Sequence, residues 1–409
     1  MENLQVKQTV NYIILLLLSK FEQYSTLTLN SSYSFQIYTN TASLPETWND
    51  LATHNIFLSR EYLEVLEKSA PTNMLCHYIG LFKDAELVGI VLTQFLDSNK
   101  LESFGERDKC VKTSVRNFAF KKFASHVLFV GNNMLTGQNA YSFSEKISQP
   151  KAIKLLHKGI NALKKDFKSK GQKIHITTIK DFSATEIDML SAEFKKGYTF
   201  SIQPNMVFKI NEDWKTEEDY INALSKKYRD QYKRTRKKAL GIEKRKMDID
   251  DIITFEDTIY DLYHHVAKNA PFNTFFLAKN HFRVFKETLK EKFLFYGYFI
   301  DGKLIGFNTL IMNGTAMDTY FLGYDESVQR EKMLYLNMLY DMIALSINRN
   351  FKEVIFARTA LEIKSSVGAK PVKMYGLITH SNSLINHNIA KLFNYLEPKT
   401  DWQERNPFK

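Results

Sequence analysis

Three apolar segments in the C-terminal third of the chain are separated by short polar turns. The segments are residues 293–300, 304–312 and 315–322, and the turns contain Asp301-Gly302 and Asn313-Gly314. Asp-Gly and Asn-Gly pairs tolerate the positive φ that tight hairpin turns demand. The pattern therefore predicts a three-stranded antiparallel meander.

Helical periodicity surrounds this meander. Apolar positions predict amphipathic helices at 257–267 and 277–292 before it and a helix at about 331–348 after it. A short apolar run at 352–357 predicts a buried strand. The predicted order is helix, helix, meander, helix, strand.

The same order occurs earlier in the chain. Residues 78–89 (YIGLFKDAELVG) are repeated at 295–306 as FYGYFIDGKLIG. The aligned identities are Gly80 with Gly297, Phe82 with Phe299, Asp84 with Asp301, Leu87 with Leu304, and Gly89 with Gly306. Around the first copy the pattern predicts helices at 59–68 and 151–170 and strands at 76–83, 87–96, 126–131 and 173–179. A repeat this far apart is too long for a solenoid unit and predicts two copies of one α/β domain, each with a mixed sheet flanked by helices.

A chain of 409 residues is long enough for two such domains. We expect an N-terminal extension at 1–34, a first domain at 35–211, a linking helix within 212–250 and a second domain at 251–409. The extension contains the apolar run Val10–Leu18, far shorter than the roughly 20 residues that span a bilayer. It lacks a signal-peptide cleavage site. It is either a spurious upstream start, a short docking helix or a poor signal, and we expect a cytoplasmic protein without a transmembrane span.

Positive charge is concentrated in the linking segment. The formal net charge is +11, and residues 226–246 contain eleven Lys and Arg against Asp230 and Glu243, which leaves about +2 for the rest of the chain. A generally cationic coat for nucleic acid is therefore not indicated. Like charges at i,i+4 repel, so this helix is either a solvated face or binds phosphates in part.

The helix that carries this charge is predicted to begin near Thr216 and to end near Gly241. An apolar stripe at four-residue spacing predicts its buried face. The stripe consists of Tyr220, Leu224, Tyr228 and Tyr232.

Cysteine and histidine usage excludes two other classes of protein. Cys76 and Cys110 are too few for a disulfide framework, which agrees with a reducing compartment. No histidine spacing fits a metal motif, and His264 and His265 are adjacent on a predicted helix, so they point in different directions. We expect no metal.

The duplicated order of elements resembles the GNAT acyltransferase fold in its double form, from about residue 35 to the C-terminus. By pattern it is similar to the Fem-type peptidoglycan amino-acid transferases and related acetyltransferase-like proteins. Three segments carry the resemblance: 204–239, with a strand, an acidic-capped helix and a basic turn; FLGYDES at 321–327; and FARTALEIKSSVGAKPVKMY at 356–375. In the third, Arg358-Thr359, Lys364 and Gly368 match the family pattern, and Ala357 stands where the pattern usually has Gly.

The resemblance implies a site in the second copy. Backbone amides near Gly323 and Tyr324 would stabilise an oxyanion, to which Lys364 and Arg358 would add positive charge. Tyr324 and Asp325 are candidates for proton transfer. The expected substrate-binding residues are Lys227, Arg229, Tyr232, Arg236, Asn308 and Thr359. The expected donor-binding residues are Gly323, Gln329 and Arg330.

Each assignment has a structural alternative. Lys364 and Arg358 could form a surface ion pair and a capped loop. Tyr324 could pack in the core, and Asp325 could cap the next helix. Asn308 either points into the cleft or satisfies a buried backbone group. The first copy has a loop-like segment at 131–141 but no cluster of proton-transfer residues, so we expect it to be a supporting domain.

The larger departure from the family pattern lies in the loop that would bind the donor. GNAT enzymes that use acetyl-CoA usually have a glycine-containing loop at the start of the central helix, where backbone amides bind the diphosphate. Here the segment is DESVQREKMLYLN, without glycine. We expect no tightly bound cofactor, and either acyl-CoA or aminoacyl-tRNA as co-substrate.

Three functions follow from these observations. The first is transfer of an acyl group from acyl-CoA to an amine acceptor, such as a cell-envelope precursor. The second is Fem-like, aminoacyl-tRNA-dependent amino-acid transfer in peptidoglycan synthesis. The third is a non-catalytic module that binds polyanions. The partners expected are a small-molecule or lipid-linked amine acceptor with phosphates, tRNA, and a peripheral contact with a membrane surface.

Overall fold

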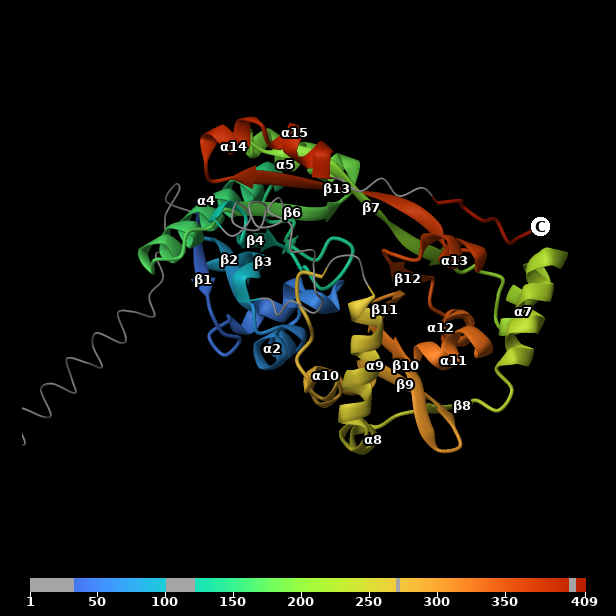
Figure 1. Cartoon of the computed structure of the whole chain (residues 1–409). Helices are drawn as coiled ribbons and strands as arrows, with labels where there is room; N and C mark the ends of the chain where they lie inside the picture. Colours follow the sequence, from blue (N-terminus) through green and yellow to red (C-terminus); the bar gives the residue numbers. More distant parts are fainter. Residues whose placement is uncertain (1–32, 101–121, 270–272, 397–401) are drawn as a thin grey trace, which may run out of the picture.

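The computed structural model describes residues 33–100, 122–269, 273–396 and 402–409, so the predictions for Val10–Leu18 and Cys110 lie outside the described residues. Within them the strands form one mixed sheet in the order β1-β2-β3-β4-β6-β13-β7-β12-β11-β10-β9-β8, with β5 beside β3 (Figure 1). The strands are β1 (Tyr33–Tyr38), β2 (Met74–Lys83), β3 (Glu86–Asp97), β4 (His126–Val130), β5 (Tyr141–Phe143), β6 (Ile176–Phe182), β7 (Tyr198–Lys209), β8 (Glu243–Lys246), β9 (Phe293–Ile300), β10 (Lys303–Asn313), β11 (Ala316–Tyr324), β12 (Glu353–Ala357) and β13 (Lys370–His380).

The helices cover both faces of this sheet, which confirms the mixed α/β fold class. They are α2 (Arg60–Ser69), α4 (Gln149–Ser169), α5 (Ala184–Glu193), α6 (Glu217–Ala223), α7 (Lys226–Lys238), α8 (Ile249–Thr254), α9 (Glu256–Lys268), α10 (His281–Leu289), α11 (Glu326–Lys332), α12 (Leu334–Asn348), α13 (Leu361–Ser366), α14 (Ser383–His387) and α15 (Ile389–Leu396).

The repeated sequence forms equivalent hairpins in the two halves. Strands β2 and β3 and strands β9 and β10 pair antiparallel, and each hairpin skips one residue of its return strand at the corresponding place. Asp84 and Asp301 both have φ 48°, as the two turns require. Phe and Leu side chains of each hairpin lie over its first glycine, so that a Cβ would lie 3.0 Å from Phe82 at Gly80 and 2.7 Å from Phe299 at Gly297. The repeat therefore preserves turn geometry and close packing.

The predicted meander of β9, β10 and β11 is confirmed, and β12 pairs parallel to β11. The first half has the same plan, with β4 parallel to β6. The two halves also exchange strands. Strand β13, from the C-terminal part of the chain, lies between β6 and β7, and β7 pairs in turn with β12. The division at residue 211 stays a proposal based on the repeat, because the sheet runs across it without interruption.

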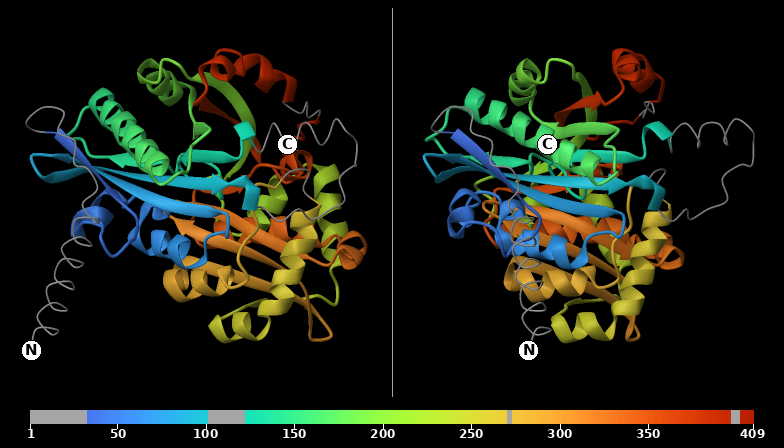
Figure 2. Two further views of the ribbon diagram at one scale, coloured as in Figure 1. Left: turned by 60° about the vertical axis from the view of Figure 1, so that its left-hand side comes forward. Right: turned by 90° about the vertical axis from the view of Figure 1, so that its left-hand side faces the viewer.

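Three apolar cores fill the space around the sheet. One lies against α4 and α5, which cover the outer face of the first half. Another lies against α6, α12 and α13 on the outer face of the second half. The third contains α2, α9 and α10, which lie between strands of the two halves (Figures 1 and 2). The halves are thus joined by a shared helical layer as well as by a shared sheet.

The prediction of one helix from Thr216 to Gly241 is wrong. Thr216 caps α6 as expected, but Leu224 and Ser225 adopt extended backbone and α7 begins at Lys226. The C-terminal segment accounts for the break: the Ser225 amide donates to the Pro407 carbonyl at 2.8 Å, and Leu224 forms an isolated β-bridge with Phe408.

Two other predicted helices differ in extent. The helix expected at 331–348 is divided at Met333, which has φ 50°, into α11 and α12. The helix expected at 277–292 extends only over α10, His281–Leu289. Both boundaries depend on local backbone geometry that apolar periodicity does not specify.

In the part of the chain that the structure describes, no helix is both long and apolar enough to cross a membrane. Within the same residues, no three His, Cys, Asp or Glu side chains are grouped so that they could hold a metal ion.

Gly323 allows α9 to lie directly on β11. A Cβ at Gly323 would lie 2.6 Å from backbone atoms of Leu262 and Tyr263. We expect Gly323→Ala to lower the free energy of unfolding by roughly 3 kcal/mol, because helix backbone has to move to accept the methyl group. Urea unfolding measures this. Gly159→Ala in α4 is the control, since its Cβ would meet side-chain atoms instead of backbone, namely two Ile79 methyl groups at 3.2 and 3.3 Å and the Phe35 ring at 3.6 Å. Equal effects of the two substitutions would contradict the packing argument.

Candidate active site

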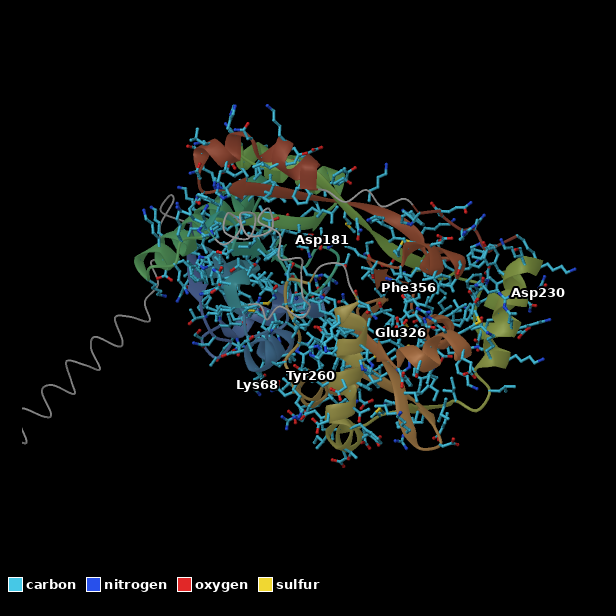
Figure 3. All side chains as sticks on the ribbon, in the orientation of Figure 1. Lys68, Asp181, Asp230, Tyr260, Glu326 and Phe356 are labelled. Carbon is cyan, nitrogen blue, oxygen red and sulfur yellow. The ribbon has the colours of Figure 1, made fainter. Side chains whose placement is uncertain are left out.

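Strands β11 and β12 diverge soon after they begin. They pair only over Ala316–Asp318 and Glu353–Ile355. A cavity of about 560 Å³ opens beyond this point. Its lining includes residues of α9 and of α12, which belong to cores on opposite faces of the sheet. The cavity therefore passes through the sheet between the two strands, beside Phe356, which Figure 3 labels.

The cavity wall is mostly apolar, with a small number of polar side chains. Its apolar part comes from side chains such as Leu322, Leu339 and Met342. Most of the ionisable groups come from β11 and from the segment after β12. These two segments contribute Asp318, Tyr320, Tyr324, Arg358, Thr359 and Lys364. A concave, largely apolar site with a few polar groups is the usual form of a ligand pocket.

Lys364 holds the end of β12. Its side chain is buried, and its ammonium group donates hydrogen bonds to the carbonyls of Phe356 and Arg358 at 2.6 Å each and of Ala357 at 3.5 Å. Burial lowers the pKa of Lys364 to about 7, whereas the three carbonyl acceptors favour the charged form. Lys364 thus lines the cavity as expected, but its donors point at backbone.

The backbone that Lys364 holds is unusual. Ala357, Thr359 and Ala360 all have left-handed conformations, with φ of 58°, 66° and 45°. Non-glycine residues adopt this region at a cost of about 1 kcal/mol or more each. The glycine that the family pattern places at position 357 is explained by this conformation. The Lys364 hydrogen bonds offset part of the strain and keep β12 from continuing along β11.

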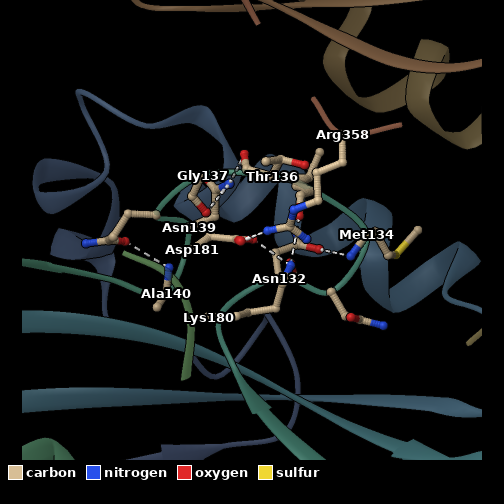
Figure 4. A network of polar contacts seen from close by, with 12 residues as sticks. Asn132, Met134, Thr136, Gly137, Asn139, Ala140, Lys180, Asp181 and Arg358 are labelled. Carbon is tan, nitrogen blue, oxygen red and sulfur yellow. Dashed lines mark hydrogen bonds and ion pairs between the residues drawn. The ribbon is translucent and has the colours of Figure 1, made fainter. Parts of the chain in front are cut away.

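Arg358 is anchored by the first half of the molecule. Its guanidinium group forms an ion pair with Asp181 (Figure 4). Its Nε donates to the Gln203 carbonyl at 3.2 Å. Asp181 is buried and also contacts Lys180 Nζ at 2.7 Å. Burial lowers the pKa of Arg358 to about 10, so the group stays charged at neutral pH. The ion pair expected for Arg358 is therefore buried and joins the two halves at the cavity.

Asp318 is a cavity residue that sequence reasoning missed. Its carboxyl group is buried and accepts a hydrogen bond from Asn313 Nδ2 at 3.2 Å. Burial raises the pKa of Asp318 to about 7, and Glu353 adds to the effect. A carboxyl group with this pKa in a cavity is suited to accept a proton near neutral pH. The signal in the sequence was an acidic residue inside a strand, where Asp is disfavoured.

Tyr320 also lines the cavity, and a hydrogen bond with the buried His281 holds its hydroxyl group. His281 Nδ1 contacts the Ser69 carbonyl at 3.0 Å, so this nitrogen carries the proton. Nε2 of His281 then accepts from the Tyr320 hydroxyl at 2.9 Å. Burial lowers the pKa of His281 to about 4, which keeps the ring neutral. The contact links α2 and α10 to β11 and holds the tyrosine in one position.

The other residues expected in the second copy lie outside the cavity lining. The Asp325 carboxylate caps α11 by accepting from the Ser327 amide at 3.0 Å. Gly323 lets the backbone of α9 pack directly against β11. Arg330 is exposed and contacts Glu326 at 3.5 Å, and Gln329 also lies on α11. Asn308 is buried and donates to the Tyr298 hydroxyl at 2.8 Å, away from the cavity.

The residues expected on the basic helix do not line the cavity either. Arg236 forms ion pairs with Glu217 and Asp341, each at 2.7 Å. The Tyr232 hydroxyl donates to the same Glu217 at 2.8 Å, so both side chains hold α7 against the protein. Lys227 lines a separate hollow beside α13, and Arg229 is half-buried on α7. The substrate-binding role of these four residues stays a prediction.

A cavity through a mixed sheet, at the point where two parallel strands diverge, is the arrangement expected of an acyl-transferring GNAT fold. The chain belongs to the FemAB-like family, described as peptidoglycan biosynthesis/recognition, whose model matches residues 41–407. Membership of this family identifies the chain as a transferase. No curated protein sequence matches it significantly.

Solved structures with a similar fold have low sequence identity. The structure of FemX is 11% identical, covers 83% of this chain and 93% of its own, and has a TM-score of 0.48. A tandem GNAT protein from the clavulanic acid biosynthesis pathway is 10% identical, with coverages of 85% and 99% and a TM-score of 0.47. L-PGS from Bacillus licheniformis is 12% identical, with coverages of 82% and 96% and a TM-score of 0.43.

Replacing Lys364 tests the role of its carbonyl contacts. We expect Lys364→Met to lower transferase activity by about a hundredfold or more, because the left-handed segment and Arg358 lose their support and shift. Initial rates and circular dichroism measure activity and folding. Lys370→Met is the control, since Lys370 is exposed and its ammonium group forms an ion pair with Glu404 at 3.1 Å, away from the cavity lining. Full activity of a folded Lys364→Met protein would rule out this role.

The raised pKa of Asp318 predicts that the difference in stability between wild type and Asp318→Asn depends on pH. Its carboxyl group ionises near 3.8 when unfolded and near 7 when folded, so the folded state binds more protons in this window. Its ionisation therefore destabilises the protein as pH rises from about 4 to 7. We expect Asp318→Asn to gain stability over wild type across this range, by at most about 4 kcal/mol at 1.36 kcal/mol per pKa unit. Urea unfolding at pH 4.5 and 8 measures it. A constant difference would show that Asp318 titrates normally.

Proposed function

We propose that the protein transfers an aminoacyl group from an activated ester, such as aminoacyl-tRNA, to an amine of a cell-envelope precursor. Its family is described by peptidoglycan biosynthesis/recognition. The cavity supports the transfer step because it is lined by residues from elements on both faces of the sheet, so a donor and an acceptor bound on opposite faces would meet in it. The observation that favours an ester donor over acyl-CoA concerns the start of α11.

Binding of a CoA diphosphate at this position needs free backbone amides at a helix N-terminus. In this protein the Asp325 carboxylate occupies that end of α11, where it accepts from the Ser327 amide at 3.0 Å and from Ser327 Oγ at 2.6 Å. These hydrogen bonds lower the pKa of Asp325, so it is anionic at neutral pH. An anion there repels a diphosphate and uses the donor that would bind it.

The reaction then has a defined balance. The acceptor nitrogen attacks the ester carbonyl, the new C–N bond forms, and the C–O bond to the ribose breaks. Asp318 takes the proton from the nitrogen, and the proton passes to the departing hydroxyl group. Arg358 stabilises the oxyanion by its charge, together with backbone amides of β11 beyond Asp318, where β12 no longer pairs. Lys364 acts as a positioning residue for this segment.

The experiment uses tRNA charged with labelled amino acids and peptidoglycan precursors as acceptors. We expect the label to reach the precursor in a form that survives mild alkali, as an amide does and an ester does not. Asp318→Asn should lower the rate by about a hundredfold or more. The matched control is Asp188→Asn, an exposed carboxylate on α5 that does not line the cavity.

Thermal melting with free CoA and acetyl-CoA distinguishes the donors. A ligand at a hundred times its dissociation constant adds about 2.7 kcal/mol of stability. We expect no shift in Tm with either compound. A clear shift, with acetyl transfer to an amine, would establish the acyl-CoA reaction instead. Transfer from neither donor would overturn the proposed function.

A further inference from the structure

The strongest charged surface of the protein lies on α7. We define the α7 basic face as six exposed Lys and Arg side chains on the outer side of this helix. They are Lys226, Lys227, Lys233, Arg234, Lys237 and Lys238. Asp230 is the acidic residue of α7 and lies among them. We propose that this face docks the protein on an anionic lipid surface. This docking does not depend on the reaction proposed above.

The charges of this face are not neutralised by the protein. Among the residues that the structure describes, none of the six forms an ion pair with a carboxylate, whereas Arg236 on the inner side forms two. Nearby cations on β8 are compensated, since Arg245 pairs with Asp251 at 3.3 Å and Lys246 with Glu291 at 2.8 Å. Uncompensated like charges on one helix repel one another, and an anionic surface relieves this repulsion.

The helix is held so that this face points outward. Tyr228 and Thr235 are buried against the protein, and Arg236 binds Asp341 on α12 and Glu217 on α6. Helix α7 lies at the edge of the molecule (Figure 1). A helix of 13 residues is about 20 Å long, so the face presents its charges along one straight outer edge.

An apolar side chain at the end of the helix favours lipid over nucleic acid. Leu240 lies two residues after Lys238, the last residue of the helix, and is 70% exposed. Basic helices with an exposed apolar residue bind the interface of anionic bilayers, where the apolar group enters the headgroup region. Nucleic-acid surfaces usually add aromatic side chains that stack on bases. Here Tyr228 is buried, and the Tyr232 hydroxyl is bonded to Glu217.

Helix α4 provides a matched comparison. It carries exposed lysines too, including Lys154, Lys165 and Lys168. Its lysines are spread over 21 residues, however, and none of the large apolar side chains exposed in the described residues lies on α4. Reversing three charges on α7 or three on α4 changes the net charge equally, so the two variants separate a specific surface from general basicity.

The experiment is co-sedimentation of the full chain with vesicles of phosphatidylcholine, alone or with an equal amount of phosphatidylglycerol, at physiological salt. We expect binding only to the anionic vesicles. Reversal of Lys233, Arg234 and Lys237 to Glu should weaken it at least about tenfold, since each basic residue near an anionic surface contributes on the order of 1 kcal/mol. Reversal of Lys154, Lys165 and Lys168 should leave most of the binding. Leu240→Ser should weaken binding at high salt, and circular dichroism checks the folding of each variant.

Three outcomes would overturn the proposal. Equal loss in the α7 and α4 variants would mean that net charge alone attracts the protein. Binding to duplex RNA or DNA through α7, without binding to vesicles, would assign the face to nucleic acid. Absence of binding to anionic vesicles at physiological salt would leave the α7 basic face as a solvated surface.

Discussion

The hydrogen bonds from Lys364 to the carbonyls at the end of β12 determine the shape of the site. Without these hydrogen bonds, nothing would offset the cost of the left-handed conformations of three non-glycine residues, and β12 would be free to continue beside β11. The early end of the parallel pairing creates the gap through the sheet. The same turn directs Arg358 toward the first half. One buried ammonium group thus links strand pairing, cavity and electrostatics.

The ion pair between Asp181 and Arg358, which joins the two halves, is as important for the site as the Lys364 hydrogen bonds. Asp181 belongs to β6 of the first copy, and Arg358 follows β12 of the second. Replacing Asp181 would leave the buried charges of Arg358 and Lys180 without their shared partner, which is costly. The first copy therefore lines the cavity through Met134, Leu135 and Thr136 and supplies the carboxylate that anchors Arg358, in addition to its supporting role. This explains how a duplicated fold can have one cavity that depends on both copies.

Local signals in the sequence were sufficient for the meander, the repeat and the fold class, because Asp-Gly and Asn-Gly turns and apolar alternation act over a few residues. They could not predict the exchange of β7 and β13, since pairing between distant strands leaves no short-range pattern. The family resemblance led to Lys364 and Arg358, and the structure places both at the cavity. It could not lead to Asp318 or Asp181, whose significance arises from burial and from a partner elsewhere in the chain.

The position of β13 also has a consequence for the order of folding. This strand separates β6 from β7, although it follows β6 by almost 200 residues in the sequence. During synthesis at about 5–20 residues per second, the edge of β6 stays without its final neighbour for roughly 10–40 s. The first half therefore emerges from the ribosome with an incomplete sheet. An exposed strand edge of this kind invites pairing with other chains, so the protein is most exposed to aggregation before its C-terminal strand arrives.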